Sequence, residues 1–216
     1  GTDYVDLYQI HWPDHGMRAA DTLEVLDEFV KEGKVRAIGL SNDDSYGVMK
    51  SLWTSDLGGM TRIDSIQNNF SLNNRRDEHE LAECLLRENV SLLPYSPLAG
   101  GVLTGKYNDG VPDGARFSEY LTNGGSRQRA MATRFVNDRT IASTKRFGEI
   151  AKELDLNVTT LATAWSKQHD FVAATIVGVR AAAQMEPILK AAGLKLDEKT
   201  LTLIDEVSNE IKYPMG

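Results

Sequence analysis

The chain of 216 residues is 41% hydrophobic and 25% charged, which supplies enough apolar material for an ordinary globular core. Its formal net charge of −7, from 31 acidic residues against 24 lysines and arginines, argues against a nucleic-acid partner while leaving room for a local basic pocket. The single cysteine, Cys84, excludes an intramolecular disulfide framework; with no apolar run near ~18 residues and no signal peptide before the first strand, we expect a cytoplasmic protein without a membrane partner.

Apolar runs alternate with helical patterns along the chain. The first four runs begin at Val5, Val35, Ile63 and Val90, so that successive starts lie 30, 28 and 27 residues apart. This is the spacing of a strand–helix repeat, roughly 30 residues or more per crossover. We therefore predict parallel β-strands over the ranges 5–11, 35–40, 63–68, 90–95 and 173–177.

Helices are predicted between and after these strands. The first should open at Asp21, with Glu24 three residues on as its capping-box partner, and stop at Gly33. The others are expected over the ranges 45–53, 77–89, 140–154, 159–169, 181–192 and 197–212. Residues 100–137 are rich in Gly, Arg and Asn and are predicted to form a long loop. They are a candidate lid, because loops above ~15 residues are usually functional or mobile.

Every predicted strand ends in residues that can take part in chemistry. The five ends read Gln9-Ile10-His11, Gly39-Leu40-Ser41-Asn42, Gln67-Asn68-Asn69, Tyr95-Ser96-Pro97 and Gly178-Val179-Arg180. In an α/β barrel the active site is built from the loops at the carboxyl ends of the strands. The sequence therefore indicates a barrel-type α/β fold with one site fed by five separate segments.

Two local motifs point to other chemistry, and both are weak. The run from Gly100 to Lys106 has the G-x-x-x-x-G-K spacing of a phosphate-binding loop, but the next residue is a tyrosine where a nucleotidase needs Ser or Thr to hold magnesium. His11 and His15 lie four residues apart, but Pro13 between them prevents the regular helix that a metal pair would need. We expect neither an NTPase nor a metal centre, and retain only the prospect of glycines near a phosphate.

Five motifs, taken together, resemble one family. They are Asp3-Tyr4-Val5-Asp6-Leu7-Tyr8-Gln9-Ile10-His11-Trp12-Pro13, Ile38-Gly39-Leu40-Ser41-Asn42, Gln67-Asn68-Asn69-Phe70-Ser71-Leu72, Tyr95-Ser96-Pro97-Leu98-Ala99-Gly100-Gly101, and Val177-Gly178-Val179-Arg180 with Gln184. In this order, each at a strand end, they closely resemble the signature segments of the aldo-keto reductases. The resemblance is nearest to the potassium-channel β-subunit-like branch and covers essentially the whole chain.

The resemblance implies roles for residues at the first four strand ends. His11 resembles the histidine that donates a hydrogen bond to the substrate carbonyl, and Tyr95 resembles the aromatic plate on which a nicotinamide ring stacks. Ser41, Asn42 and Gln67 resemble the residues that hold the nicotinamide carboxamide. Without the family, His11 would be a core or strand-end histidine, the three carboxamide residues would be turn formers, and Tyr95 a packed aromatic.

The remaining motif residues resemble the segments that hold the phosphates of NADP(H). Those set against the pyrophosphate are Ser96, Pro97, Leu98, Ala99, Gly100, Lys106 and Arg116, and those set against the adenosine phosphate are Gly178, Arg180 and Gln184. An arginine in this position can hold a 2′-phosphate through two parallel hydrogen bonds. The alternatives are that Arg116 is plain surface and that Arg180 caps or salt-bridges the neighbouring helix.

The chain departs from the family pattern in two places. Pro187 and Ile188 stand where the family usually has a glutamate and an asparagine that hold the adenine and ribose, which implies weaker or different contacts there. The family's proton-donating tyrosine, with its aspartate and lysine partners, belongs to three strand–helix units that precede the first strand found here. We therefore expect a single domain over residues 1–216, forming the C-terminal five-eighths of a (β/α)8 TIM barrel, which when complete typically has ~250 residues.

The function implied by the resemblance is an oxidoreductase that transfers a hydride from NADPH to the carbonyl of an aldehyde or ketone. Because the tyrosine that acts as general acid is missing, this chain alone should be inactive. The alternative is an NADP-binding regulatory or redox-sensing subunit with little turnover. An unrelated barrel fragment with a phosphate ligand would need all five motifs to coincide by chance. The identity of the carbonyl compound and the oligomeric state stay open.

Overall fold

A computed structural model gives the structure of the protein and describes residues 1–215. The chain divides into two compact units. The first, here called the sheet unit, comprises Gly1–Asn69, Asp77–Leu93 and Asp170–Ala174. The second, the helical unit, comprises Phe70–Arg76, Pro94–His169 and the rest of the chain from Thr175. Each unit is described by itself, and the expectation of a single domain stays a prediction.

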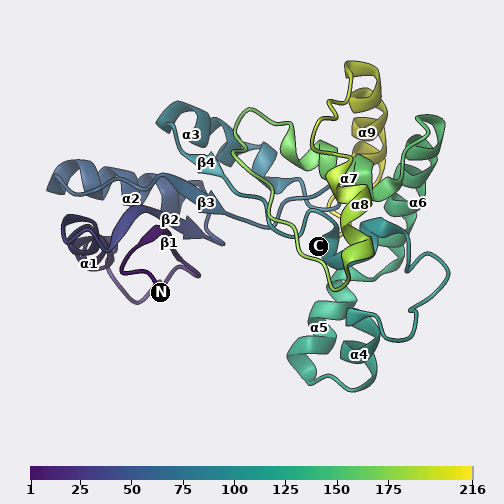
Figure 1. The fold of residues 1–216 in the computed structure, drawn as a ribbon, viewed down its shortest axis with the longest axis horizontal. Helices are drawn as coiled ribbons and strands as arrows, with labels where there is room; N and C mark the ends of the chain where they lie inside the picture. Colours follow the sequence, from purple (N-terminus) through teal and green to yellow (C-terminus); the bar gives the residue numbers. More distant parts are fainter. Residues whose placement is uncertain (216) are drawn as a thin grey trace. The chain divides into compact units, whose positions relative to one another are not determined.

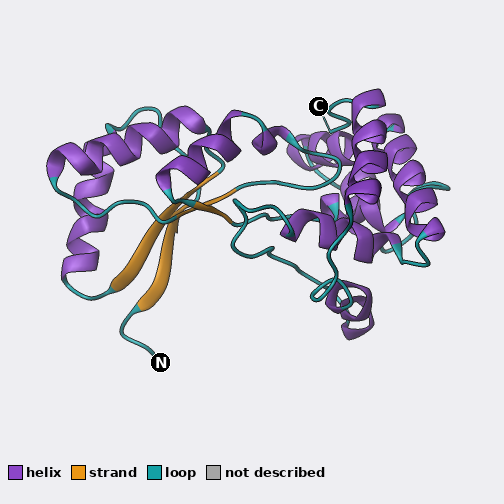
Figure 2. Cartoon of the chain, turned by 90° about the horizontal axis from the view of Figure 1, so that it is seen from above, coloured by secondary structure: helices purple, strands orange, loops and turns teal. Residues whose placement is uncertain are grey.

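The sheet unit is built on a four-stranded parallel sheet (Figures 1 and 2). Its strands are β1 (Val5–Ile10), β2 (Val35–Ser41), β3 (Ser65–Gln67) and β4 (Ser91–Leu92), in the order β1-β2-β3-β4. The register pairs Gln9 with Gly39 and Ser41 with Gln67. The carboxyl ends of β1, β2 and β3 therefore lie side by side, and the predicted parallel α/β architecture is confirmed.

Helices α1 (Ala19–Lys31), α2 (Ser45–Gly58) and α3 (Glu80–Glu88) follow β1, β2 and β3 in turn. Ile38, Ile66 and Leu85 are fully buried between the sheet and these helices. Helix α2 begins where the Asp44 carboxylate accepts a hydrogen bond from the Gly47 N–H. The predicted opening of α1 at Asp21 with a capping box is wrong: α1 begins at Ala19, and Asp21 forms an ion pair with Arg18.

The fifth predicted strand, residues 173–177, does not form. It is reduced to an isolated bridge between Leu92 and Val172, continued by a hydrogen bond of 3.0 Å from the Ala173 N–H to the Leu92 carbonyl. The predicted fourth strand, 90–95, is only two residues long in the structure. Pro94 limits it, because a proline has no N–H to donate to a neighbouring strand. With so short a strand to pair with, residues 173–180 run as irregular, mostly exposed chain.

The helical unit contains α4 (Arg116–Thr122), α5 (Ser126–Phe135), α6 (Asp138–Glu153), α7 (Val158–Lys167), α8 (Met185–Leu189) and α9 (Glu198–Glu210). The 3-10 helices η2 (Ala99–Thr104) and η3 (Ala182–Gln184) precede α4 and α8, and a third, η1 (Arg76–Glu78), precedes α3. In its core the Trp165 ring stacks on Phe70 with centroids 4.9 Å apart. None of the helices within residues 1–215 is long and apolar enough to cross a membrane.

Two predicted boundaries in this unit are wrong. Residues 100–137 are not a structureless loop, since they hold η2, α4 and α5. Phe117 and Phe135, one from each α-helix, pack with ring centroids 5.2 Å apart and anchor the segment. The predicted helix 181–192 shortens to η3 and α8, because Pro187 is tolerated only in the first turn of a helix. A lid role for residues 100–137 stays a prediction.

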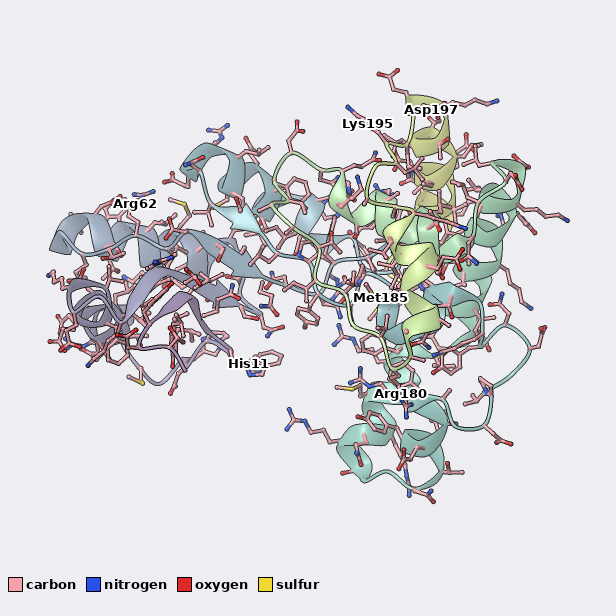
Figure 3. The ribbon with its side chains drawn as sticks, viewed as in Figure 1. His11, Arg62, Arg180, Met185, Lys195 and Asp197 are labelled. Carbon is pink, nitrogen blue, oxygen red and sulfur yellow. The ribbon has the colours of Figure 1, made fainter. Side chains whose placement is uncertain are left out.

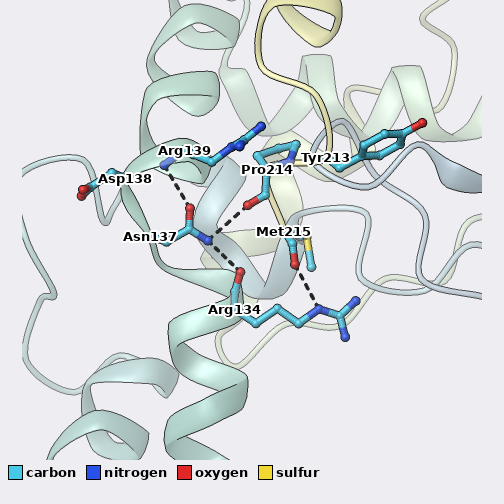
Figure 4. Close-up of a pocket in the computed structure, with 7 residues that line it drawn as sticks. All are labelled: Arg134, Asn137, Asp138, Arg139, Tyr213, Pro214 and Met215. Atoms are coloured by element: carbon cyan, nitrogen blue, oxygen red, sulfur yellow. Dashed lines mark hydrogen bonds between the residues drawn. The ribbon is translucent and has the colours of Figure 1, made fainter.

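The last described residues are held against α5 and α6 (Figure 4). Arg134 Nε donates to the Met215 carbonyl at 3.2 Å, and Asn137 Nδ2 donates to the Pro214 carbonyl at 3.2 Å. Asn137 also begins α6, because its side-chain oxygen accepts from the Arg139 and Thr140 N–H groups at 3.0 Å. The cavity of about 650 Å³ beside these residues contains none of the site residues predicted from the sequence.

Candidate cofactor site

In the sheet unit, the three neighbouring strand ends are joined by side-chain hydrogen bonds. Gln67 Nε2 donates to Gln9 Oε1 at 2.7 Å, and Ser41 Oγ donates to the Gln67 carbonyl at 2.7 Å. Gln9 Nε2 in turn donates to Ser65 Oγ and to the Leu40 carbonyl, each at 3.3 Å. We call Gln9, Ser41, Asn42 and Gln67 the amide cluster. It presents several amide and hydroxyl groups at one edge of the sheet.

Asn42 completes this cluster in a constrained backbone conformation. Its φ is +56°, in the left-handed region that asparagine tolerates better than most residues. Its Nδ2 donates to the His11 carbonyl at 2.9 Å and lies 3.0 Å from Ser41 Oγ. Asn42 therefore ties the end of β2 to the end of β1, as well as to its own neighbour.

The His11 side chain is exposed, so the core-histidine interpretation is wrong for this structure (Figure 3). Its ring lies 5.8 Å from that of Trp12, which is 58% exposed. Residues 12–17 after it are a turn without helix. An exposed imidazole next to the amide cluster is free of core packing and is available to contact a ligand.

Asn68 supports the amide cluster from the residue after Gln67. Its Oδ1 accepts from the Asp43 N–H at 3.3 Å and its Nδ2 donates to the Asp43 carbonyl at 2.9 Å. Burial raises the pKa of the nearby Asp77 carboxyl to about 6, although the Asn68 amide acts in the opposite direction. Burial likewise raises the pKa of Asp43.

In the helical unit, seven residues predicted from the sequence line one cavity of about 390 Å³. They are Leu98, Gly100, Lys106, Arg116, Gly178, Arg180 and Gln184. These residues come from η2 and its flanks, from the start of α4, and from the chain before η3, which are up to 86 positions apart. We call this cavity the cationic pocket, because three of these side chains carry positive charge and no carboxylate among the described residues lines it.

The charges of the cationic pocket act on one another. Burial lowers the pKa of Lys106, and the nearby positive charge of Arg180 lowers it further. Arg180 Nη1 donates to the Gly114 carbonyl at 3.2 Å, so this guanidinium is placed by a neutral group. Arg116 lies over the rings of Phe117 and Tyr120, at 5.7 and 5.6 Å from their centroids. Positive charges gathered in this way are stabilised by an anion.

The glycines of η2 bring the backbone close to this pocket. Gly100 has φ +63°, and a Cβ built on it would lie 2.6 Å from Cζ of Phe117. Gly101 has φ +96°, and a Cβ there would lie 2.9 Å from Lys106 Nζ. The two glycines therefore leave the space into which Phe117 and the Lys106 ammonium fit.

Four of the predicted residues that belong to the helical unit do not line the cationic pocket. Ser96 and Ala99 have positive φ values of +56° and +48°, and Pro97 is buried, so all three shape the turn that leads into η2. Tyr95 is half-buried, and its carbonyl accepts from the Phe70 N–H at 3.3 Å. The Gln184 side-chain oxygen accepts from the Arg180 and Ala181 N–H groups at 2.8 and 3.3 Å, so it caps η3 from within the pocket wall.

The pocket also contains residues that the sequence did not single out as binding residues. They are Gly101, Thr104, Asn157, Thr159, Val179, Pro187 and Ile188. The departure at Pro187 and Ile188 gives the pocket one apolar wall, and the Pro187 carbonyl is already bound by the Thr160 hydroxyl at 2.7 Å. The glycine-rich motif before Lys106 was a signal for Gly101, whereas Asn157 and Thr159 lie at the start of α7 with no local motif.

Comparisons with known proteins give a consistent result. Residues 1–209 match the family described as the aldo/keto reductase family. The chain is 35% identical over 234 residues to Protein tas of Escherichia coli, covering 99% of this chain and 64% of that protein. It is 28% identical to an NADH-specific methylglyoxal reductase of the same organism, covering 98% of this chain and 61% of the relative. The chain thus spans less than two thirds of the length of these curated relatives.

A solved structure supports the fold. The glycerol dehydrogenase of Gluconobacter oxydans superposes with a TM-score of 0.75 at 23% sequence identity, covering 98% of this chain and 60% of that one. At this identity the likeness concerns the fold, and it shows that the parallel sheet and its helices are arranged as in that enzyme.

Proposed function

The chain belongs to the aldo/keto reductase family, and from this premise we propose that the protein carrying it transfers a hydride from NADPH to the carbonyl of an aldehyde or ketone. The observation that supports this most directly is the cationic pocket. Lys106, Arg116 and Arg180 converge on one cavity with two positive-φ glycines, and no described carboxylate neutralises them there. Cations and backbone amides of this kind suit the phosphates of a dinucleotide.

The residues of the sheet unit are proposed to hold the reactive end. Asn42, Ser41 and Gln67 offer the donors and acceptors that a carboxamide needs. The bonds from Asn42 to Ser41, from Ser41 to the Gln67 carbonyl and from the Gln67 side chain to Gln9 fix their orientation. His11, whose ring is exposed, is proposed to donate a hydrogen bond to the substrate carbonyl oxygen. Tyr95 is proposed to support one face of the nicotinamide. When bound, the reduced cofactor supplies the hydride, and the chain's own residues bind and orient.

Cofactor choice is proposed to depend on Arg180. A guanidinium can hold a 2′-phosphate through two parallel hydrogen bonds, which a 2′-hydroxyl cannot reproduce. One named relative is NADH-specific, so membership of the family does not decide the cofactor.

None of the relatives named above is a channel subunit, and the potassium-channel β-like branch stays a prediction from the sequence. We propose a cytoplasmic location, because a single unpaired cysteine suits a reducing compartment. That cysteine is Cys84, and burial raises the pKa of its thiol.

The test uses the complete gene product. We expect it to oxidise NADPH in the presence of aldehydes or ketones and to bind NADPH about ten- to a hundred-fold more tightly than NADH, the range expected for hydrogen bonds to a charged group. Arg180→Ala should remove most of this difference and leave NADH binding nearly unchanged. Arg127→Ala, an exposed arginine of α5, is the matched control. Titration by tryptophan fluorescence measures the affinity of all three proteins for both cofactors.

Three results would distinguish the proposed reductase from its alternatives. NADPH binding without turnover on any carbonyl compound would favour the redox-sensing alternative. Equal affinities for the two cofactors in the wild type would show that Arg180 is structural. A protein that binds neither cofactor would contradict the proposal as a whole.

A further inference from the structure

The Asn68 side chain extends the sheet beyond the point where β2 and β3 end. Its amide makes both hydrogen bonds of a strand neighbour to one residue, Asp43, accepting from the N–H at 3.3 Å and donating to the carbonyl at 2.9 Å. Asn68 is only 7% exposed, and a buried amide is costly unless it is bonded. The orientation of its oxygen and nitrogen is therefore fixed by the Asp43 backbone.

These two bonds act on the residue before Asp43. Asn42 has a φ of +56°, and a non-glycine residue keeps such a conformation only when its surroundings hold it. Its N–H donates to the Gln67 carbonyl at 3.1 Å on one side, and Asn68 holds the next peptide group on the other. Asn42 is thus fixed from both ends, and it is the residue that bonds both the His11 carbonyl and Ser41.

Asp77 is close enough to the Asn68 side chain for that amide to lower the pKa of its carboxyl against the effect of burial. The Asp77 Oδ2 oxygen is buried with no hydrogen-bond partner. An unpartnered buried carboxyl oxygen is costly and calls for a reason other than stability. What Asp77 supplies is a second acceptor for Nδ2, which disfavours a rotation that would exchange the amide oxygen and nitrogen of Asn68.

We propose that Asn68 and Asp77 are positioning residues for the nicotinamide carboxamide: Asp77 sets the orientation of the Asn68 amide, and Asn68 sets the backbone at Asn42. This rests on the proposed function of the amide cluster. Neither residue touches the ligand. Their effect is on the entropy of the site, because a side chain held in its binding orientation loses less freedom when the ligand arrives.

The positioning depends on pH. With a pKa of about 6, the Asp77 side chain changes from a neutral acid to a carboxylate as the pH rises through that value. A carboxylate accepts a stronger hydrogen bond from the Asn68 N–H than the neutral acid does. Carboxamide binding should therefore tighten as pH rises through about 6. Titratable groups near Asn68 include Asp43, which is bonded to it through its backbone, and Asp44 and His15, whose charges act on Asp43. Glu78 and His79 follow Asp77 along the chain. A His15→Ala variant separates the contribution of His15.

The test compares two ligands on the complete gene product. NADPH carries the nicotinamide proposed for the amide cluster and the phosphates proposed for the cationic pocket, whereas adenosine 2′,5′-bisphosphate carries phosphates without a nicotinamide. Its 2′-phosphate titrates as that of NADPH does, but its 5′-phosphate is a monoester that also titrates near pH ~6, so the pH profiles are compared between the wild type and each variant. We expect Asn68→Ala and Asp77→Ala to weaken NADPH about five- to tenfold, the value of about one net hydrogen bond, with the bisphosphate unchanged.

Two variants make the result specific. Asp77→Asn keeps an acceptor for Asn68 Nδ2, so it should restore NADPH affinity at neutral pH. It should also remove the part of the pH dependence of the ratio that Asp77 causes, leaving the part that the 5′-phosphate of the bisphosphate causes. Asn209→Ala, an exposed asparagine of α9, should change nothing. If Asn68→Ala weakened both ligands equally, or if Asp77→Asn kept the wild-type pH profile, the inference would be wrong. A wild type that binds neither ligand would instead contradict the proposed function.

Discussion

The amide cluster of the sheet unit and the cationic pocket of the helical unit differ in whether their polar groups satisfy one another. Gln9, Ser41, Asn42 and Gln67 donate to and accept from each other or the neighbouring backbone at distances between 2.7 and 3.3 Å. The pocket instead collects like charges, and the proximity of Arg180 contributes to the lowered pKa of Lys106. A site for a neutral amide can thus be organised before its ligand binds.

The same contrast is seen in the backbone. The amide cluster is placed by a regular parallel register, in which Ser41 pairs with Gln67. The pocket is placed by a turn in which Ser96, Ala99, Gly100 and Gly101 all have positive φ values. Conformations of this kind cost free energy and persist only where packing enforces them. We infer that the sheet unit contributes orientation, whereas the helical unit contributes electrostatic affinity that is realised only with an anion bound.

The sharpest test of this division is His11, because its loss should leave the helical unit untouched. In the complete gene product, His11→Ala should lower kcat by roughly 10²–10⁴, the range for a positioned acid–base or hydrogen-bonding group. Cofactor affinity should change little, since the exposed His11 ring is proposed to contact the substrate. His15→Ala, four residues further on and also exposed, is the matched control.

Steady-state kinetics with NADPH and an accepted aldehyde would measure this effect. A comparable rise in the dissociation constant for NADPH would show that His11 belongs to cofactor binding, and the division between the two regions would then fail.

Sequence reasoning identified the parallel α/β fold because strand starts near Val5, Val35, Ile63 and Val90 recur at the spacing of a strand–helix repeat. It failed where contacts between distant parts of the chain determine the secondary structure. Residues 116–135 lack helical periodicity in a stretch rich in Gly and Arg, yet they form α4 and α5 because their aromatic side chains pack together.

The candidate site shows the same limit. Its predicted residues came from motifs that resemble a family, and seven of them meet in the cationic pocket. Gln9 and Asn68 were present in the quoted motifs but were given no role, because their importance lies in bonds to Gln67 and Asp43, 58 and 25 positions away. A single sequence carries no local pattern for such a contact.

A stability comparison between two glycines tests the strained turn. Gly100→Ala should destabilise the folded protein by roughly 1–3 kcal/mol, because alanine disfavours a φ of +63° and its Cβ would press on the Phe117 ring. Gly148→Ala, in α6 with nothing within 4 Å of the added Cβ, should instead stabilise it by about 0.4–1 kcal/mol. Urea unfolding of both variants and the wild type gives the values. Equal effects would mean that the turn before the pocket stores no strain.

The smallest expected effect concerns an ionic contact that stabilises the sheet unit. It lies in a part of that unit other than the amide cluster. The buried Asp27 carboxylate pairs with Lys31 at 2.5 Å and accepts from the Thr61 N–H and hydroxyl at 2.9 and 2.8 Å. The Lys31 contact, followed by the bonds from Thr61, lowers the pKa of Asp27 to about 2. A folded-state pKa below the ordinary value of about 3.9 gives stability that is complete above pH ~4 and is lost as pH falls towards 2.

Asp27→Asn should therefore be less stable than the wild type at pH 7, and the difference should shrink as the pH is lowered to about 2. Asp113→Asn, at an exposed loop position, should follow the wild type throughout. Denaturant midpoints measured at several pH values between 7 and 2 would give both curves, and a difference independent of pH would show that the Asp27 contact is steric, leaving hydrogen bonds between neutral groups as the main polar support of the sheet unit.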